Sequence, residues 1–514
     1  MKRTNVFPGG GGSIYRLLNK NIKEFNKIKL SILCIVFLLS VGFISYKINS
    51  SYALFSDSIV GNNTIEISPN LSLDKSGANE PLLDEGMIPV YYDSTNNVWK
   101  KADKTNRNKS YKWYDYANKM WANSVTVSST NRNKYLSTEP GTEIPMSDIL
   151  TMQVWIPRYK YKVWNYNENG TATSNEQQIE ITWESGVDKT GEISCQDSIS
   201  GTDGAPSETC KLKATNETCT DSICNNKTYT HPAFTFGNEE LKGFWIGKFE
   251  LTGTISNITT KPNLSSLRSQ TISSFETNIM SMKNSSNQYG FSTNTDTHMI
   301  KNSEWGAVAY LSHSKYGTCT NGNCKEIGIN NNSNYITGCG AAAGSSSSKT
   351  CNAYNTVTGI PASTTENIYG IYDMSGGEWE YTMGNIVSND STTMISGTES
   401  SDNSGYTGKL YDYGSNTSYT GIDYPNNKYY DKYSFITRYD SRINSKLGDG
   451  IKEVYKRGSE GWYSDSSCVA SSDGPWFIRG GDIMRGDYSG VFRSNGASGG
   501  FDYSTNSTRL IISP

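Results

Sequence analysis

The sequence contains few apolar and few charged residues for its length. Of its 514 residues, 35% are hydrophobic and 19% are charged, whereas an ordinary globular domain is about 45–50% apolar. Asn, Ser, Thr, Gly and 34 Tyr fill much of the difference. Aromatic residues make up 12%, which argues against a disordered chain because disorder goes with few aromatics and high net charge. The composition predicts a polar, β-leaning surface protein.

Basic stripes and catalytic motifs are also missing. The 47 Lys and Arg nearly balance the 50 Asp and Glu, which argues against a nucleic-acid partner because phosphate contacts need clustered basic residues. No Walker loop or His-Glu-x-x-His motif occurs. His231, His298 and His313 lack the spacing of zinc ligands. We therefore expect no enzymatic activity, no metal site and no cofactor.

A single long apolar run, residues 30–46, lies near the N-terminus behind several basic residues. Such an arrangement keeps the basic end in the cytoplasm and sends the following chain across the membrane. The run suits either a short transmembrane anchor or a long signal-peptide core, with small residues for cleavage at Ser51-Tyr52-Ala53. Both alternatives stay open for residues 1–53. In either case the rest of the chain is expected outside the cell or at its surface.

The cysteines fit an oxidising compartment. Cys219 and Cys224 enclose a short polar turn, and Cys319 and Cys324 enclose a similar one. The natural remaining pairs are Cys195 with Cys210 and Cys339 with Cys351, which leaves Cys468 unpaired. Connectivity does not follow from sequence alone, so these disulfides are a hypothesis. Zinc binding is the alternative, disfavoured because the spacing is C-x4-C rather than C-x2-C.

Residues 54–147 predict a small β-rich module and a connector. The first twenty residues alternate polar and apolar positions and resemble the mature start of camelysin-type exported proteins. Trp99, Trp113 and Trp121 indicate closure by aromatic packing, with a stacking platform for a ligand as the alternative. The Ser/Thr/Asn-rich residues 128–147 form the expected connector.

Residues 148–514 predict an α+β domain. Strand patterns begin at Met152 and recur at 243–253, and apolar residues at helical spacing mark helices within 271–282 and 302–313. A polar, cysteine-rich insertion occupies roughly residues 190–230. This order favours a small antiparallel sheet with two helices and long loops.

Two phrases in this region carry a family resemblance. Residues 369–385 read YGIYDMSGGEWEYTMGN, and residues 476–496 read WFIRGGDIMRGDYSGVFRSNG. Together with WIPRYKYKV, FWIGKFELTG and NSEWGAVAYLSH, they resemble the formylglycine-generating-enzyme-like domain, a branch of the C-type-lectin fold. The resemblance covers about residues 150–514. We also expect Arg479 to reach Glu380 as a bidentate pair.

Departures from the family pattern bear on function. The catalytic members carry a pair of reactive cysteines after the Arg-Gly-Gly, whereas this chain has no cysteine beyond Cys468. Gly377 stands where the family has Asn, and Ser507-Thr508 stand where it has Gly-Phe. Glu378 and Glu380 could form a glycosidase-type acid/base pair, but they are neighbours on one strand rather than opposed across a cleft. The resemblance therefore implies a non-catalytic variant.

The segment after Arg479 suggests a binding surface, because it is rich in Tyr, Ser, Gly and Asn, which favour adaptable recognition. In C-type-lectin-fold proteins that retroelements diversify, the variable residues lie in the corresponding segment. An ordinary Gly-rich surface loop is the alternative. The candidate ligand-binding residues are Trp476, Arg485, Asp487, Tyr488, Phe492, Arg493, Asn495, Asp502, Tyr503 and Asn506.

These features together predict a non-catalytic, cell-surface recognition protein, or adhesin. Its expected partner is an extracellular protein or glycan, with membrane contact through the N-terminal segment if that segment is uncleaved. The alternative is a structural component of an extracellular fibre or envelope layer, suggested by the camelysin-like start and the Tyr-rich composition.

Overall fold

The computed structural model describes residues 72–514 apart from 167–173, 398–403, 413–414, 439–442 and 457. Residues Leu73–Pro514 form one compact unit. The apolar run at 30–46, the cleavage motif and nearly all of the camelysin-like start lie outside the described residues. None of the helices within the described ranges is long and apolar enough to cross a membrane.

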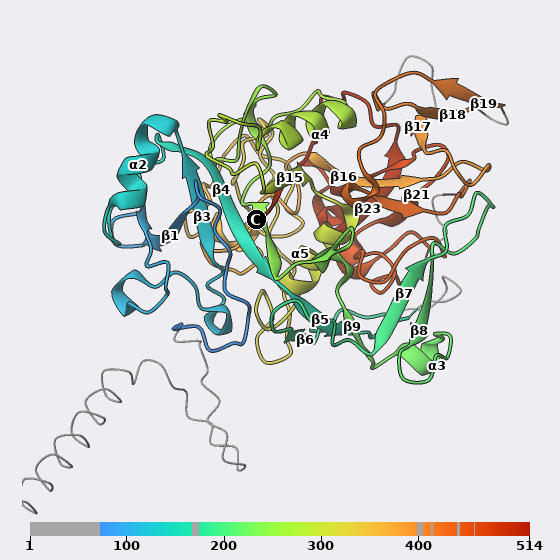
Figure 1. Ribbon diagram of the computed structural model, residues 1–514, viewed down its shortest axis with the longest axis horizontal. Helices are drawn as coiled ribbons and strands as arrows, with labels where there is room; N and C mark the ends of the chain where they lie inside the picture. The colour runs from blue at the N-terminus through green and yellow to red at the C-terminus, as the bar shows by residue number, and fades with distance from the viewer. Residues whose placement is uncertain (1–71, 167–173, 398–403, 413–414, 439–442, 457) are drawn as a thin grey trace, which may run out of the picture. The chain divides into compact units, whose positions relative to one another are not determined.

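The main sheet has seven strands, and each neighbouring pair is antiparallel (Figure 1). In spatial order they are β15 (Asp296–Met299), β25 (Leu510–Ser513), β12 (Gly243–Gly247), β4 (Ile149–Pro157), β3 (Asn123–Val127), β1 (Ile88–Asp93) and β2 (Val98–Lys101). Strand β4 is nearly continuous in apolar residues, which agrees with its burial on both faces. The C-terminal strand β25 lies inside this sheet, between β15 and β12.

The N-terminal strands belong to this same sheet. Strand β3 pairs with β4 over residues 123–127 and 149–154, and β1 pairs with β3. The boundary predicted near residue 147 therefore falls within one continuous sheet. The main sheet is larger than the small one expected for residues 148–514, because β1, β2 and β3 extend it.

A second sheet, of mixed direction, carries both family-like phrases. Its order is β20 (Asp431–Tyr433), β16 (Trp379–Ile386), β22 (Trp476–Gly480), β23 (Gly490–Ser498) and β21 (Ser467–Ala470), with β24 (Asn506–Ser507) also pairing with β16. Strands β20 and β24 run parallel to β16, whereas β22 is antiparallel to it. All residues of β16 and β22 are buried.

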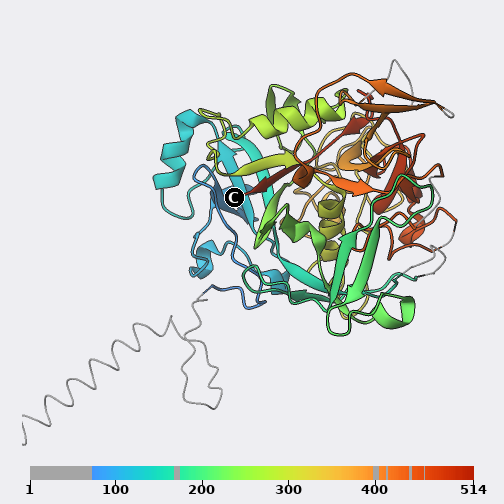
Figure 2. The same cartoon turned by 45° about the vertical axis from the view of Figure 1, so that its right-hand side comes forward.

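Short sheets complete the β structure. They are β6–β5–β9 (Ile181–Trp183, Tyr159–Lys162, Thr228–Thr230), β7–β8 (Ile193–Asp197, Glu208–Leu212), β10–β11 (Thr235–Phe236, Glu239–Glu240), β13–β14 (Thr252–Thr254, Asn257–Thr259) and β17–β18–β19 (Ile395–Gly397, Gly408–Asp412, Ser415–Tyr419). The β7–β8 hairpin and the short helix α3 (Asp221–Cys224) form the cysteine-rich insertion, which lies at the lower edge in both cartoon views (Figures 1 and 2).

Both predicted helices of the α+β domain are confirmed. Helix α4 (Ile272–Ser281) starts where the Thr271 hydroxyl accepts a hydrogen bond from Ser274 N, and it buries one apolar side. Every residue of α5 (Asn302–Ser312) is buried, and the helix packs against β16 and β23. The mixed α+β class is thus confirmed, with sheets predominating.

Helix α2 (Ser129–Ser137) shows that the predicted connector at 128–147 was wrong in part. Its sequence STNRNKYLS buries only Tyr135. An apolar stripe is the main sequence signal for a helix, and this segment has none.

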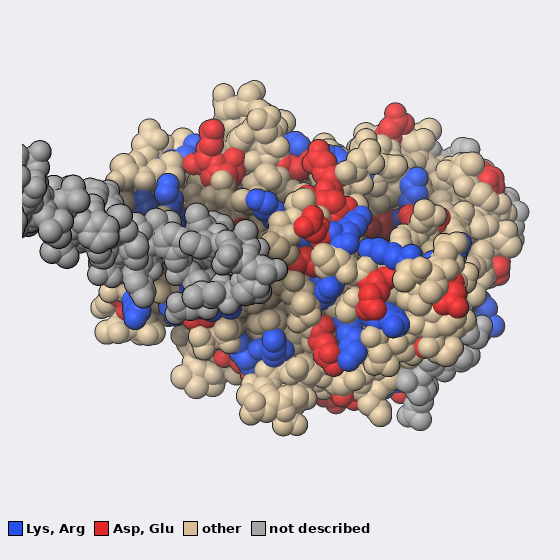
Figure 3. All heavy atoms as spheres, turned by 60° about the horizontal axis from the view of Figure 1, so that its bottom comes forward, with Lys and Arg blue, Asp and Glu red and all other residues tan. Residues whose placement is uncertain are grey.

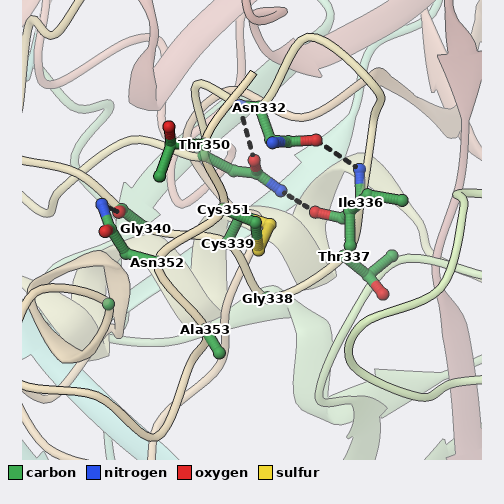
Figure 4. The surroundings of a disulfide bond; sticks show 12 residues. Asn332, Ile336, Thr337, Gly338, Cys339, Gly340, Thr350, Cys351, Asn352 and Ala353 are labelled. Carbon is green, nitrogen blue, oxygen red and sulfur yellow. Dashed lines mark hydrogen bonds between the residues drawn. A yellow bond between two sulfur atoms is a disulfide. The ribbon is translucent and has the colours of Figure 1, made fainter. Parts of the chain in front are cut away.

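The four predicted disulfides are confirmed: Cys195–Cys210, Cys219–Cys224, Cys319–Cys324 and Cys339–Cys351. Cys468 is free and buried. Figure 4 shows the surroundings of Cys339–Cys351, where the Asn352 amide donates to Gly340 O at 2.9 Å. The disulfides indicate an oxidising, extracellular environment.

The expected pair between Arg479 and Glu380 was wrong, although the two residues lie opposite each other in β22 and β16. The Glu380 carboxylate is instead bound by both Nε and Nη2 of Arg509, which β24 and β25 bring across from the C-terminus. Arg479 donates to the Asn302 side chain and to the carbonyls of Arg493 and Asp449, at 2.8–2.9 Å. Both guanidinium groups are fully buried and hydrogen-bonded, as buried charges must be.

Candidate ligand-binding surface

Two glycines mark the point where the chain leaves strand β22 of the second sheet and the C-terminal segment begins. Gly480 and Gly481 follow the core of β22 with φ values of 81° and 77°, a left-handed conformation that favours glycine. A Cβ at Gly481 would lie 2.5 Å from Ser489 Oγ, so a side chain there has no room. Ser489 Oγ donates to Asp482 O at 2.9 Å and closes the loop 482–489 before β23 begins.

Four of the ten predicted binding residues belong to the interior. Trp476 and Phe492 are completely buried, Asn506 is 3% exposed and Arg493 is 6% exposed. Trp476 stacks on Tyr424, and Phe492 packs edge-on against Trp462. These side chains support the surface from below rather than forming it.

The other six predicted residues lie at the surface, five of them exposed and Asn495 partly buried. The exposed ones are Arg485, Asp487, Tyr488, Asp502 and Tyr503. Tyr488 is 58% exposed, and the neighbouring Met484, which the sequence analysis did not select, is 69% exposed. Met484 directly follows Ile483, which is only 4% exposed, and no apolar periodicity in the sequence distinguishes the exposed residue from the buried one.

Trp379 contacts both loop 482–489 and the chain just before β24. Its ring lies 5.9 Å from the Arg485 guanidinium and 5.1 Å from that of Arg493, within the range of cation–π attraction. Its backbone N–H donates to Thr505 O at 3.0 Å, where β24 pairs with β16. Arg493 in turn donates to Tyr488 O at 2.8 Å. Loop 482–489 and the chain before β24 are therefore anchored to one buried strand.

The carboxylates Glu378 and Glu380 do not act as a pair. Glu378 accepts from Arg268 Nη1 at 2.8 Å, whereas Glu380 is held by Arg509. Burial raises the pKa of Glu378 to about 8, against the opposing charge of Arg268. Each carboxyl has its own guanidinium partner.

Gly377 is required by its surroundings. Its φ is 75°, and a Cβ there would lie 2.4 Å from the Glu250 carboxylate, which accepts a hydrogen bond from Glu378 N. Within the described ranges, two groups of side chains have metal-ligating geometry, His313 with Cys319 and Cys324, and Glu208 with Cys195 and Cys210. The sulfurs in both groups are engaged in disulfides.

The surface combines aromatic, thioether, cationic and anionic side chains on a rigid support. Tyrosine supplies contact area at low entropic cost, and Arg485 and Asp487 supply charge-assisted hydrogen bonds. Such a surface suits recognition of a macromolecule. In comparisons with protein-family models and with curated proteins, nothing matches this chain.

Proposed function

We propose that this chain is a non-catalytic cell-surface recognition protein of the formylglycine-generating-enzyme-like branch of the C-type-lectin fold. Its ligand, an extracellular protein or glycan, binds the exposed part of the C-terminal segment. One observation carries the proposal: Met484, Arg485 and Tyr488 are exposed on a loop that Trp379 and Arg493 fix to a buried sheet. Aromatic and Arg side chains contribute much of the binding energy at protein interfaces. A pre-organised support lowers the entropic cost of binding.

The non-catalytic part of the proposal rests on the carboxylates and cysteines. Glu378 and Glu380 face different arginines, so they cannot divide acid and base roles across one substrate. Among the described cysteines, all except the buried Cys468 are in disulfides, which leaves no thiolate pair after Arg479.

Arrays of glycans and extracellular proteins test the proposal. The full chain is compared with the double variant Arg485→Ala/Tyr488→Ala and with the control Val357→Ala, an 89% exposed residue outside the segment. We expect the double variant to lose at least about tenfold in affinity for whatever the wild type binds, because two anchors are removed. Both variants should keep the wild-type unfolding midpoint, since exposed substitutions change stability by only about 0.5 kcal/mol. Equal binding by all three proteins would contradict the assignment.

Sequencing the 3′ end of the gene across a population tests the narrower hypothesis of a diversified surface. Diversification predicts changes at exposed positions such as Tyr488, Asp502 and Tyr503, with Trp476 and Arg479 fixed because they are buried. An invariant 3′ end would exclude diversification and leave a binder of fixed specificity. Self-assembly of the purified chain into fibres would favour the structural alternative instead.

A further inference from the structure

Two adjoining cavities form a groove beside the cysteine-rich insertion, and none of the residues that line it belongs to the C-terminal surface. Their volumes are about 340 and 500 Å³. Four residues line both cavities and mark where they meet: Asp197, Thr235, Lys301 and Asp431. The two hollows therefore form one continuous site.

One wall of the groove is the β7–β8 hairpin and the other is the chain around β20. The Cys195–Cys210 disulfide staples the hairpin across directly paired positions. Leu447 N donates to the Glu208 carboxylate at 2.6 Å, and Ser434 N donates to Ser207 Oγ at 2.9 Å. These contacts fix the distance between the walls before any ligand arrives.

Lysines line both walls of the groove, and Lys301 lies where the two cavities meet. Six line the two cavities, against four carboxylates: Lys189, Lys213, Lys301, Lys428, Lys432 and Lys446, with Asp197, Glu208, Asp431 and Asp449. Glu208 and Asp449 are buried, and backbone N–H groups already bind their carboxylates. Figure 3 shows basic side chains gathered in a hollow of the face it presents, with acidic ones among and around them. The lining itself therefore holds two more lysines than carboxylates.

Three of the six lysines have a close acidic partner. Lys189, Lys428 and Lys446 pair with Glu240, Asp296 and Asp197 at 2.6–2.9 Å. Lys213 donates only to a carbonyl, that of Lys189 at 3.3 Å, and Lys432 lies 5.6 Å from the Tyr430 ring. In the described part of the chain, neither of these two ammonium groups contacts a carboxylate within 4 Å.

Lys301 is the most informative of the six. It is 4% exposed, yet it lines both cavities. Its Nζ lies 3.9 Å from a Glu304 oxygen that His298 already contacts at 3.0 Å, and 5.3 Å from the Phe236 ring. Across the described residues its ammonium donates no hydrogen bond. Its one carboxylate contact is long and shared with His298, so an anionic ligand in the groove would supply a closer acceptor.

The rest of the lining indicates which anion. Hydroxyl and amide groups line the cavities together with the lysines, among them Ser194, Thr235, Asn238 and Asn427. Such groups match sugar hydroxyls, and separated lysines match negative charges repeated along a chain. We propose that this groove binds an acidic glycan, a chain of sugars that carries carboxylate or sulfate groups.

Binding of two polysaccharide probes to the full, disulfide-oxidised chain tests the proposal. Heparin supplies sulfates and carboxylates, polygalacturonate supplies carboxylates alone, and dextran and poly-glutamate are the controls. We expect heparin or polygalacturonate to bind more tightly than both controls, with an affinity that falls as salt rises.

The variant Lys213→Gln/Lys432→Gln should weaken that binding about tenfold or more, and Lys301→Gln should weaken it further. Lys325→Gln, whose lysine is exposed and lines neither cavity, should bind like the wild type. The Lys213 and Lys432 changes remove no ion pair, so the double variant keeps the test valid even if Lys301→Gln does not fold. Equal binding by the double variant and Lys325→Gln would overturn the site. Equal or tighter binding of poly-glutamate would overturn the glycan class, and binding of none of the probes would overturn the proposal.

Discussion

The cysteine-rich insertion and the C-terminal segment both present polar surfaces, but they are held in place by opposite means. Strands β7 and β8 bury few side chains, and two disulfides staple the insertion. Strands β22 and β25 are wholly buried and contain no cysteine. Where the chain offers little apolar surface to bury, covalent links replace the core, as in small disulfide-rich domains.

Removing Arg509 should give the largest effect and would test how far the interior depends on buried charge. Arg509→Ala leaves Glu380 buried without its partner, so we expect a loss of about 3–5 kcal/mol in the free energy of unfolding. Urea denaturation followed by tryptophan fluorescence measures this. The matched variant Arg509→Leu/Glu380→Leu should lose less, because no orphaned charge remains. A loss below about 1 kcal/mol in the single variant would mean that the pair contributes little.

Removing a disulfide tests the other half of the comparison. Cys195→Ala/Cys210→Ala frees a loop closed across 15 residues, which costs about 3 kcal/mol by the chain-entropy relation. Hydrogen exchange should accelerate in residues 193–212 and stay slow in β22. Cys319→Ala/Cys324→Ala, with a separation of 5 residues, is the control and should cost only about 2 kcal/mol. Uniform acceleration across both regions would show that they unfold as one unit.

The smallest of the three effects is a change in folding stability with pH. It arises at Glu208, where the β7–β8 hairpin of the insertion contacts Leu447. Burial raises the pKa of Glu208 from its ordinary 4.5 to about 7, against the opposing charge of Lys452. The folded state therefore binds this proton more tightly than the unfolded state. Its stabilising contribution is fully present below about pH 4.5 and is lost as the pH rises through 7. Between pH 5 and 7 the loss is about 2 kcal/mol.

Glu208→Gln provides the control for this pH dependence, because glutamine fills the site without titrating. Thermal unfolding across pH 5–8 should show a flatter stability profile for the variant than for the wild type. Identical profiles would assign the pH dependence to other buried carboxyls, such as Glu276 or Glu453, whose pKa values burial raises to about 8.

Local signals in the sequence predicted much of this fold. The disulfide partners are near neighbours along the chain, and α4 and α5 carry apolar residues at regular spacing. The Arg509–Glu380 pair spans 129 residues, and nothing local distinguishes Arg509 from Arg479 as the partner. The N-terminal strands likewise belong to the main sheet because β3 pairs with β4 and β1 pairs with β3, and the local sequence does not reveal these pairings.

The two candidate sites differ in the same way. The exposed part of the C-terminal surface comes from one short segment, so residue types alone indicated Arg485, Asp487 and Tyr488. The burial of Phe492 in this segment was not apparent, because glycines interrupt the alternation along β23, and Trp476 lies in β22, before the segment begins. The groove gathers lysines from position 189 to position 446, which form no cluster in the sequence. Only folding brings them together.

The position of β25 has a consequence for synthesis. Residues 510–513 fill the gap between β15 and β12, so the main sheet cannot close until these residues have left the ribosome. A partly synthesised chain would expose two unpaired strand edges, a state prone to mispairing and slow to resolve because the missing contacts are so distant in sequence.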